Sequence, residues 1–453
     1  MDIMKYASKY IAIPLYDLRN DQHYGGMLTS LERSQYAPVE LIRERQLASV
    51  KAIIKYAGEH TSFYRRRLAA QGMTAEDIRS LEDIASFPVL TKDDIRANLD
   101  DMISDEFARE NLRHKRTGGS TSVPLQIYVD PTAYAYKYAA TRRHNRWAGY
   151  GAGDKLAAIW GATDRVYSTK EKLVNYFIFR TIYLDTLKLD EPYMLSFIEK
   201  VRKYRPRTLI GHAHSLYIFA LFVEEQGEKN LPFEGIISTS EILYDNERAV
   251  IERVFGPILF DRYGCEELSI VASECDQHDG LHINAEGLYV EVLGGDETNP
   301  GNLVITDLWN RGKPLIRYEV GDRATTKSGV CSCGRGLPRL GRVYGRTSDF
   351  LYTPEGKMLS GISILDTFTI HIPGFKQVQI VQDRIDELAF RVVKGNGFDD
   401  NSIRILAEKI PEFFGPAMKH RVEFVERIPQ TQRGKYRFTI CNVGKAEDER
   451  ADA

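Results

Sequence analysis

Short apolar segments alternate with helical stretches through the middle of this chain, and this alternation limits the possible folds more than any other feature. Four apolar segments between residues 112 and 310 have the length and composition of strands, at 125–129, 155–160, 208–212 and 234–239. Helical spacing occurs at 133–147, 192–203 and 247–254. Strands that are separated by helices usually pair in parallel. The sequence therefore predicts an α/β domain with a mainly parallel sheet.

The regions on either side of this domain have different patterns. Residues 38–70 and 74–82 have the periodicity of amphipathic helices, so we expect a helical N-terminal part over 1–110. A turn-rich stretch at 294–302 predicts a pair of antiparallel strands. After residue 345 the pattern becomes strand, strand, helix, strand, with segments at 378–383, 388–395, 400–410 and 421–428. We therefore expect a large domain over 1–345 with mixed sheets and helices, and a small, mobile α+β domain over 346–453.

The overall composition excludes several classes of function. Lys and Arg number 61 against 63 Asp and Glu, so the net charge of -2 gives no electrostatic attraction to nucleic acid or to an anionic membrane. No apolar run approaches the roughly 18 residues that span a bilayer. The N-terminus lacks a signal-peptide core, so we expect a cytoplasmic protein. Five cysteines in 453 residues leave metal binding or plain burial as their roles.

A loop rich in glycine and hydroxyl side chains precedes the first of these strands. In RTGGSTSVPLQIYVD, residues 116–130, the glycines let backbone N–H groups approach a phosphate closely, and the hydroxyls are further donors. No Gly-Lys-Ser/Thr follows, so the loop is not a Walker motif. An ordinary Ser/Gly hairpin is the alternative interpretation.

Three more segments place charged side chains near the end of an apolar strand. In FDRYGCEELS, Glu266 or Glu267 could hold Mg²⁺, or the two could be solvated acids at the start of a helix. In PLIRYEVGDRA, Asp322 could accept both hydroxyls of a ribose, or it could be a turn residue. In ERIPQTQRGKYRFT, Lys435 lies in a basic loop that could also be a solvated charge cluster. Each of these segments is weak as a signal when it is taken alone.

Together, and in this order, the four segments resemble the adenylate-forming superfamily of acyl-CoA synthetases, adenylation domains and luciferases. TGGSTSVPLQ, YGCEE, CSCGRGLPRLGRVYGRTSD and the YGG that opens a helix at 24–33 are similar to the phenylacetate-CoA ligase and CapK-like branch. The resemblance implies ATP-dependent activation of a carboxylic acid to its acyl-AMP with release of pyrophosphate, followed by transfer to CoA. Transfer to an amine or a carrier thiol in polysaccharide or secondary-metabolite biosynthesis is the alternative. A non-catalytic nucleotide-binding protein is a more remote one.

The resemblance also implies a role for each matching position. Lys435 would be the catalytic lysine, carried on the small domain, and Glu267 would hold Mg²⁺ in catalysis. The ATP-binding positions would be Thr117, Gly118, Gly119, Ser120 and Thr121 at the pyrophosphate, Ser240 and Glu241 at the adenine, Tyr263 and Gly264 beside the adenylate, and Asp322 and Arg346 at the ribose.

Two positions depart from the family pattern. Leu125 and Gln126 follow Pro124, where a lysine is often found, so that contact to phosphate is missing here. The hinge position that is often Asp is Ser348, with Asp349 next to it.

A group of cysteines and histidines could bind zinc. The segments ECDQHDGLH and CSCGR contain enough thiol and imidazole ligands for a tetrahedral Zn²⁺. The resemblance favours the set Cys275, His282, Cys331 and Cys333, with His278 as the alternative histidine. Thiols without a metal are the other interpretation, and Cys265 and Cys441 look unrelated to the group.

The pocket for the acid is harder to identify. Trp147 and the segments 160–165 and 211–221 have the aromatic content that suits an aryl or apolar acid, although His212 and His214 could equally be core histidines. The expected partners are a small carboxylic acid, ATP, and CoA or another acyl acceptor. A homodimer is one assembly that the sequence leaves open.

Overall fold

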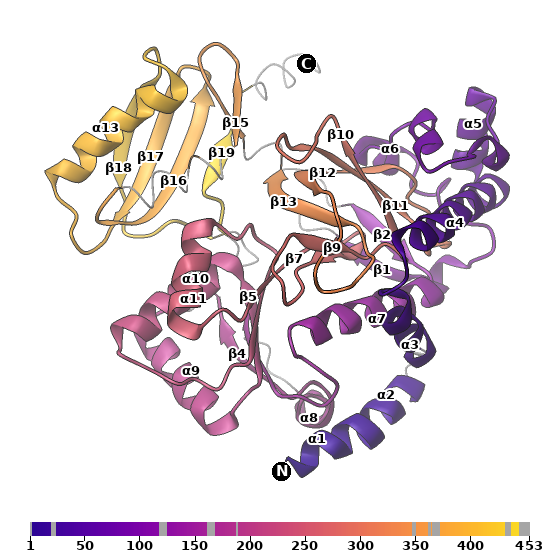
Figure 1. Ribbon diagram of the computed structural model, residues 1–453, viewed down its shortest axis with the longest axis horizontal. Coiled ribbons are helices and arrows are strands. Elements are labelled where there is room, and N and C mark those ends of the chain that lie inside the picture. The colour runs from indigo at the N-terminus through magenta and orange to yellow at the C-terminus, as the bar shows by residue number, and fades with distance from the viewer. Residues whose placement is uncertain are drawn as a thin grey trace.

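An eleven-stranded sheet runs through the larger part of the molecule (Figure 1). The computed structural model describes residues 2–19, 24–116, 125–160, 168–186, 189–346, 350–360, 364, 372–430 and 436–443. The strand order is β10-β11-β12-β13-β9-β8-β7-β6-β5-β3-β4. The parallel half consists of β3 (Leu156–Trp160), β4 (Thr181–Asp185), β5 (Thr208–His212), β6 (Gly235–Thr239) and β7 (Leu259–Cys265). The predicted α/β fold is confirmed.

The other half of this sheet is antiparallel. It consists of β8 (Ser269–Ser273), β9 (Leu281–Ile283), β10 (Leu288–Leu293), β11 (Gly301–Asp307), β12 (Tyr318–Lys327) and β13 (Arg339–Arg346). The direction changes at β7, which is parallel to β6 and antiparallel to β8. The antiparallel pair that the sequence predicts around 294–302 is present as β10 and β11.

The helices between the parallel strands bury their apolar faces against the sheet. They are α9 (Glu191–Tyr204), α10 (Ala213–Glu225) and α11 (Asp245–Phe255), which lie together beside β4 and β5 in Figure 1. Phe197, Phe219 and Ile251 are almost completely buried in one core with Ile159 of β3. This core fixes the ends of β5 and β6, from which candidate site residues project.

The N-terminal part is helical, but two of its expected helices differ from the prediction. Its helices are α1 (Ile3–Ala7), α2 (Ile13–Arg19), α3 (Gly25–Ser34), α4 (Val39–His60), α5 (Ser62–Gln71) and α6 (Lys92–Ala97), with a π-helical turn η1 (Ser8–Ala12) between the first two. The predicted helix 38–70 is divided at Thr61, whose backbone is extended and whose side chain accepts the N–H of Tyr64. The helix predicted at 74–82 is wrong, because the buried Ile78 is extended and only the 3-10 turns η2 (Ala75–Asp77) and η3 (Glu82–Ser86) form among these described residues.

A short hairpin precedes the main sheet. Strands β1 (Arg113–Arg116) and β2 (Gln126–Val129) are antiparallel, and Arg116 is paired with Gln126. After β2, α7 (Pro131–Trp147) begins at Asp130, whose side chain accepts the N–H of Ala133. The remaining short helices are α8 (Thr169–Val174), the π-helical turn η5 (Asn175–Phe179) and the 3-10 turn η4 (Arg109–Asn111).

A second sheet forms a separate small lobe, seen in yellow and orange in Figure 1. Its elements are β14 (Phe350–Tyr352), β15 (Met358–Ser360), β16 (Phe375–Arg384), β17 (Glu387–Lys394), α13 (Asp400–Phe414), β18 (Lys419–Phe424) and β19 (Thr439–Cys441). Four of these strands form one sheet in the order β18-β17-β16-β19, and β14 and β15 form a separate pair. The predicted strand, strand, helix, strand pattern is present, with β19 added in parallel to β16. The boundary at 345/346 and the mobility of this lobe stay predictions.

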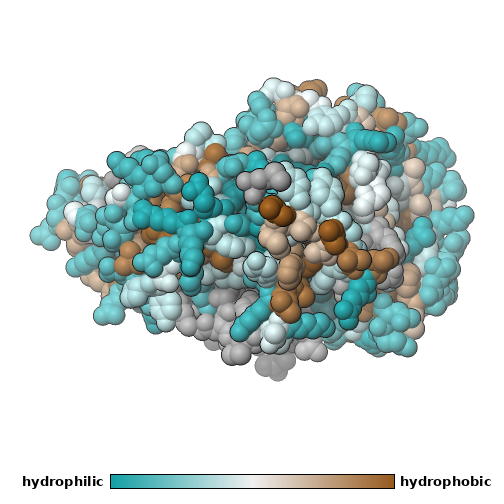
Figure 2. All heavy atoms as spheres, turned by 90° about the horizontal axis from the view of Figure 1, so that it is seen from below, coloured by the Kyte–Doolittle hydropathy of each residue, from teal (hydrophilic) through white to brown (hydrophobic). Residues whose placement is uncertain are grey.

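Within the described residues, no helix has both the length and the apolar character that crossing a bilayer requires. Apolar side chains nevertheless gather on one face of the molecule, shown in brown in Figure 2. Among the exposed apolar residues of the N-terminal helices, Ile3, Tyr10, Ile11, Leu15 and Leu18 each have 61% or more of their surface exposed.

Candidate functional site

Two tyrosines, the half-buried Tyr263 and the buried Tyr318, each hold one of the two acidic residues that the sequence singles out. The hydroxyl of Tyr263, on β7, donates to Asp322 Oδ2 at 2.6 Å. The hydroxyl of Tyr318, on β12, donates to Glu267 Oε1 at 2.9 Å. Because three strands, β13, β9 and β8, lie between β12 and β7 in the sheet order, the antiparallel half must curve strongly to bring β7 and β12 together. The structure therefore brings Tyr263, Glu267 and Asp322 close together, while the roles that the resemblance implies for them stay predictions.

The ionisation of these tyrosines is fixed by their surroundings. Burial, followed by the charge of Asp322, raises the pKa of Tyr263 well above its ordinary value. Burial and the charge of Glu267 likewise raise the pKa of Tyr318. Both hydroxyls therefore stay protonated and act as donors, so each orients a carboxylate by a charge-assisted hydrogen bond.

The backbone of Glu267 is held by a residue that the sequence did not indicate. Lys137, on α7, donates from Nζ to the carbonyl of Glu267 at 3.1 Å and forms an ion pair with Asp307 at 2.7 Å. Both charged side chains of this pair are buried. Lys137 lies on the buried face of the predicted helix 133–147, and a lysine at such a position could have indicated a buried partner of opposite charge. Tyr318 also lay inside the segment that contains Asp322.

The neighbouring acid, Glu266, is placed differently. It is exposed and lies 3.7 Å from the ammonium group of Lys115, on β1. The geometry therefore favours Glu267 over Glu266 as the metal ligand. The Lys115 contact also places the end of β1 beside the segment that carries Glu267.

The predicted phosphate loop begins at this end of β1. Its residues Thr117, Gly118, Gly119, Ser120 and Thr121 lie outside the described residues. The pairing of Arg116 with Gln126 nevertheless fixes the two ends of the loop next to each other. Arg346, at the end of β13, is paired across the sheet with Asp322, so its backbone belongs to the same site. The hinge candidates Ser348 and Asp349 also lie outside the described residues.

Gly264 has a steric reason to be glycine. A Cβ atom at this position would lie 2.5 Å from the carbonyl oxygen of Ser269, on the adjacent strand β8. The close approach of β7 and β8 keeps Tyr263, on β7, next to the tight turn 266–268 that carries Glu267.

Ser240 and Glu241 follow β6, at the carboxyl end of the parallel strands. Ser240 has a left-handed backbone conformation, with φ of 70°. Glu241 Oε1 accepts the backbone N–H of Tyr436 at 2.6 Å, and Oε2 accepts the N–H of His214 at 3.2 Å. Burial raises the pKa of Glu241 to about 7. Tyr436 belongs to the small lobe and directly follows Lys435, which itself lies outside the described residues.

The four predicted zinc ligands converge. One ligand atom from each of Cys275, His282, Cys331 and Cys333 lies within 4.8 Å of all the others. Cys275 Sγ is 3.8 Å from Cys331 Sγ, and Cys333 Sγ is 3.3 Å from His282 Nε2. Two sulfur ligands at about 2.3 Å from a tetrahedral zinc are separated by about 3.8 Å. The donor set and its spacing therefore fit Zn²⁺.

The surroundings of His282 prepare it as a ligand. Its Nδ1 lies 3.1 Å from the carbonyl oxygen of Leu337, so Nδ1–H donates and Nε2 faces Cys333 with its lone pair. Burial lowers the pKa of His282 to about 4, which keeps the ring neutral. The alternative, His278, lies instead 3.2 Å from Glu274 Oε2. The geometry thus favours His282.

The candidates for the acid pocket are dispersed. Trp147 packs in the core around the Cys/His group, with its ring centroid 5.8 Å from that of His282, which argues against a place in the acid pocket. His212 packs against Trp160, at a ring distance of 4.7 Å, and residues 161–165 lie outside the described residues. His214 is a buried histidine between the two lobes, as the alternative interpretation of it allowed.

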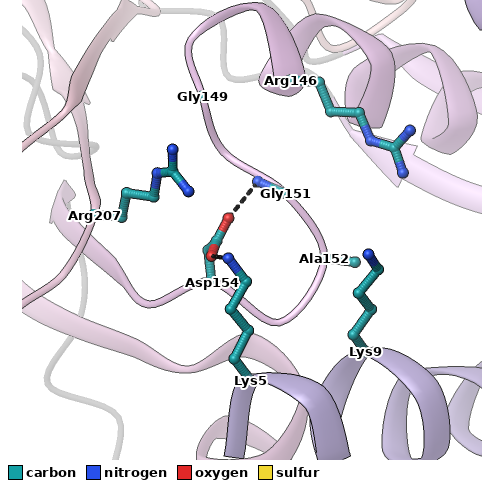
Figure 3. A pocket seen from close by; sticks show the side chains of 8 residues that line it. All are labelled: Lys5, Lys9, Arg146, Gly149, Gly151, Ala152, Asp154 and Arg207. Carbon is teal, nitrogen blue, oxygen red and sulfur yellow. Dashed lines mark hydrogen bonds and ion pairs between the residues drawn. The ribbon is translucent and has the colours of Figure 1, made fainter. Parts of the chain in front are cut away.

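A separate cavity of about 310 Å³ lies between the N-terminal helix and the loop before β3 (Figure 3). Lys5, Lys9, Arg146 and Arg207 line it together with Asp154. Lys5 forms an ion pair with Asp154 at 2.6 Å, and Asp154 accepts the N–H of Gly151. Of the described residues that line this cavity, none is a site residue named above.

Comparison with known proteins shows which proteins this chain is similar to. The CapK C-terminal domain family matches residues 351–442. The CapK protein of Staphylococcus aureus is 24% identical over 409 residues, which cover 88% of this chain and 89% of CapK. A phenylacetate-coenzyme A ligase of Thermus thermophilus is 25% identical over 354 residues, covering 73% of this chain and 74% of the ligase.

The solved structures give the same fold. A 2-hydroxyisobutyryl-CoA ligase in the postadenylation state superposes with a TM-score of 0.72 at 20% identity, over 93% of this chain and 94% of the ligase. The same ligase in the thioesterification state superposes with a TM-score of 0.59. The fold is therefore that of the adenylate-forming CoA ligases. CapK and the phenylacetate-CoA ligases are homologues of this chain, which confirms the resemblance seen in the sequence.

Proposed function

We propose that this protein joins a carboxylic acid to AMP with ATP and then transfers the acyl group to CoA. The observation that carries the proposal is the paired arrangement of Tyr263 with Asp322 and of Tyr318 with Glu267. The homology to AMP-forming CoA ligases supports both half-reactions.

In the first step, an oxygen of the substrate carboxylate attacks the α-phosphorus of ATP, and the bond to the departing pyrophosphate breaks. Asp322 would accept the ribose hydroxyls, with its carboxylate oriented by Tyr263. The loop 117–121 would donate N–H and O–H groups to the leaving pyrophosphate, and Lys435 would bridge the carboxylate and the α-phosphate. These contacts act by positioning and by stabilising the charge that develops.

Glu267 would hold Mg²⁺, because its buried carboxylate is a hard oxygen ligand whose orientation Tyr318 fixes. When bound, this ion neutralises charge on the nucleotide phosphates. Lys137 keeps the backbone of Glu267 in place for that purpose.

In the second step, the sulfur of CoA attacks the acyl carbon of the acyl-AMP, the bond to AMP breaks, and the thiol proton leaves. Rotation of the small lobe would withdraw Lys435 and admit the thiol, as in other two-step reactions gated by domain motion.

The proposal is tested by a panel of aryl, fatty and hydroxy acids, with pyrophosphate release measured with and without CoA. The proposal predicts acid-dependent release and an acyl-CoA product by mass spectrometry. Acid-dependent release without any acyl-CoA product would instead favour an amine or a carrier thiol as the acceptor. No release with any acid would contradict the enzymatic proposal.

We also propose that Cys275, His282, Cys331 and Cys333 hold a structural Zn²⁺. Their spacing leaves no open ligand position, which is typical of structural rather than catalytic zinc. We further propose a homodimer, the assembly that the sequence left open, because Ile3, Tyr10, Ile11, Leu15 and Leu18 expose apolar surface on the N-terminal helices. Light scattering should give twice the chain mass, and Ile11→Lys should reduce it to the mass of one chain; a single-chain mass before the substitution would contradict the dimer.

A further inference from the structure

A chain of buried polar groups crosses from the large lobe to the small lobe. His214, on α10, lies with Nδ1 2.5 Å from Glu247 Oε1 and with Nε2 2.9 Å from Gln377 Nε2, on β16. A carboxylate can only accept, so Nδ1–H donates to Glu247. The lone pair on Nε2 then accepts a hydrogen bond from Gln377.

The other atoms around His214 agree with this assignment. The three side chains His214, Glu247 and Gln377 are 4%, 2% and 8% exposed. Burial lowers the pKa of His214 to about 3, so the ring is neutral and keeps the Nε2 lone pair. Gln377 Oε1 in turn accepts the N–H of Ile428 at 3.5 Å. The donor and acceptor roles are therefore consistent along the whole chain of contacts.

A second contact between the lobes lies beside the first. Glu241 Oε1 accepts the backbone N–H of Tyr436 at 2.6 Å, while Oε2 accepts the N–H of His214. The ring of Tyr436 packs on His214 at 4.5 Å. Tyr436 is bridged to Gln430, so these two residues close the loop that carries Lys435 at its base.

From this arrangement we infer that Glu241 is a positioning residue for Lys435, and that the Glu241–Tyr436 and His214–Gln377 contacts form an interlobe latch specific to the adenylation step. This inference rests on the proposed function, and the predicted adenine contact of Glu241 stays a prediction beside it. A carboxylate that receives the N–H next to Lys435 fixes where the lysine chain begins. The same contacts must break before the small lobe turns for acyl transfer.

The comparison with the 2-hydroxyisobutyryl-CoA ligase is consistent with the latch. The chain superposes better on the postadenylation state than on the thioesterification state of that ligase, with TM-scores of 0.72 and 0.59. The lobes of this protein, with Glu241 in contact with Tyr436, are therefore arranged more like those of the postadenylation state than like those of the thioesterification state.

Glu241→Gln is the test variant. Both partners of the carboxylate, the N–H groups of Tyr436 and His214, are donors. An amide has only one oxygen, so a glutamine that accepts from one N–H turns its own NH₂ group toward the other and loses that hydrogen bond. We expect acyl-AMP formation to slow by about 100-fold, the cost of misplacing a catalytic group by about 1 Å. Transfer to CoA from supplied acyl-AMP should stay within about twofold. Glu225→Gln, an exposed acid at the end of α10, is the matched control and should leave both half-reactions unchanged.

A general structural defect would slow both half-reactions, and that outcome would overturn the inference. The double variant Glu241→Gln/Lys435→Ala should be no slower than Lys435→Ala alone, because Glu241 acts through the lysine. A further loss in the double variant would also overturn it. Gln377→Met, which removes the donor to His214 at similar volume, should reproduce the selective loss.

Hydrogen exchange separates this inference from the proposed function, since it needs no substrate. The amide of Tyr436 should exchange at least about tenfold faster in Glu241→Gln than in the unmodified protein. If no acid is a substrate but this exchange accelerates, the proposed reaction fails and the contact stands. If the exchange of Tyr436 is unchanged, the latch is refuted whatever the activity.

Discussion

Loss of one cysteine from the Cys/His group should lower the stability of the large lobe by an amount that depends on zinc. Cys275 and His282 lie on the β8–β9 segment, and Cys331 and Cys333 lie in the connection between β12 and β13. A metal would therefore join two segments that are far apart in sequence. The ligand atoms already lie within 4.8 Å of one another, so little rearrangement opposes binding.

The size of the effect follows from linkage between binding and folding. Free zinc at about 1,000 times its Kd stabilises the folded state by about 4 kcal/mol. The unfolding entropy of about 2.1 cal/mol/K per residue means that, for a lobe of roughly 345 residues, each kcal/mol shifts Tm by about 1.4 °C, which gives a loss of about 6 °C. The apolar core that contains Trp147, Leu281 and Leu340 surrounds the group and should keep the lobe folded without the metal.

The assay compares the unmodified protein with Cys331→Ser and with Cys441→Ser, a buried cysteine of the small lobe that serves as the control. Elemental analysis should find about one zinc per chain in the unmodified protein and in the control, and little in Cys331→Ser. A chelator should lower Tm in the first two proteins and have no effect on Cys331→Ser. The zinc site would be refuted if the unmodified protein, produced with added zinc, contained no zinc and if a chelator did not change its Tm.

Three further predictions concern buried charges. Glu267→Gln should slow acyl-AMP formation by about 100-fold or more in single-turnover assays, because the metal ligand is lost; a rate within twofold would contradict the assignment. Lys137→Met leaves Asp307 buried without its cation and should destabilise the protein by about 3–5 kcal/mol in thermal unfolding, whereas an unchanged Tm would show that the ion pair is not needed. Burial and the nearby arginines lower the pKa of His144 well below 6.5 in the folded protein. As the pH decreases, His144 is therefore protonated in the unfolded chain before it is protonated in the folded protein, and the free energy of unfolding falls. From pH 6.5 to 5 this histidine should cost about 2 kcal/mol, a part of the acid sensitivity that His144→Gln should remove.

Local patterns in the sequence were sufficient for much of the fold. The helices α9 and α11 and the strands β5 and β6 lie within about two residues of their predicted limits, because apolar spacing and burial agree there. The helix predicted at 74–82 failed because Ile78 is buried in an extended conformation that its spacing does not reveal. Strand β19 has three residues and forms only by pairing with β16.

The candidate site shows the same division. Asp322 and Glu267 could be identified from motifs at the ends of strands, and the Cys/His group could be identified from two short segments. Their partners were not, because the contact of Lys137 with Asp307 joins residues 170 positions apart, which no local pattern records. The contact of Glu241 with Tyr436 depends on how the two lobes meet, so the sequence could identify the residue but not this contact.

The most direct test of the proposed reaction is a comparison of the two half-reactions in Lys435→Ala. Once an acid substrate has been found, acyl-AMP formation and transfer to CoA from supplied acyl-AMP are measured separately in single turnovers. We expect the first to fall by at least about 100-fold and the second to stay within about threefold, since the lysine acts only where charge develops on the α-phosphate. Full acyl-AMP formation by Lys435→Ala would contradict the assignment of the small lobe as the carrier of the catalytic charge.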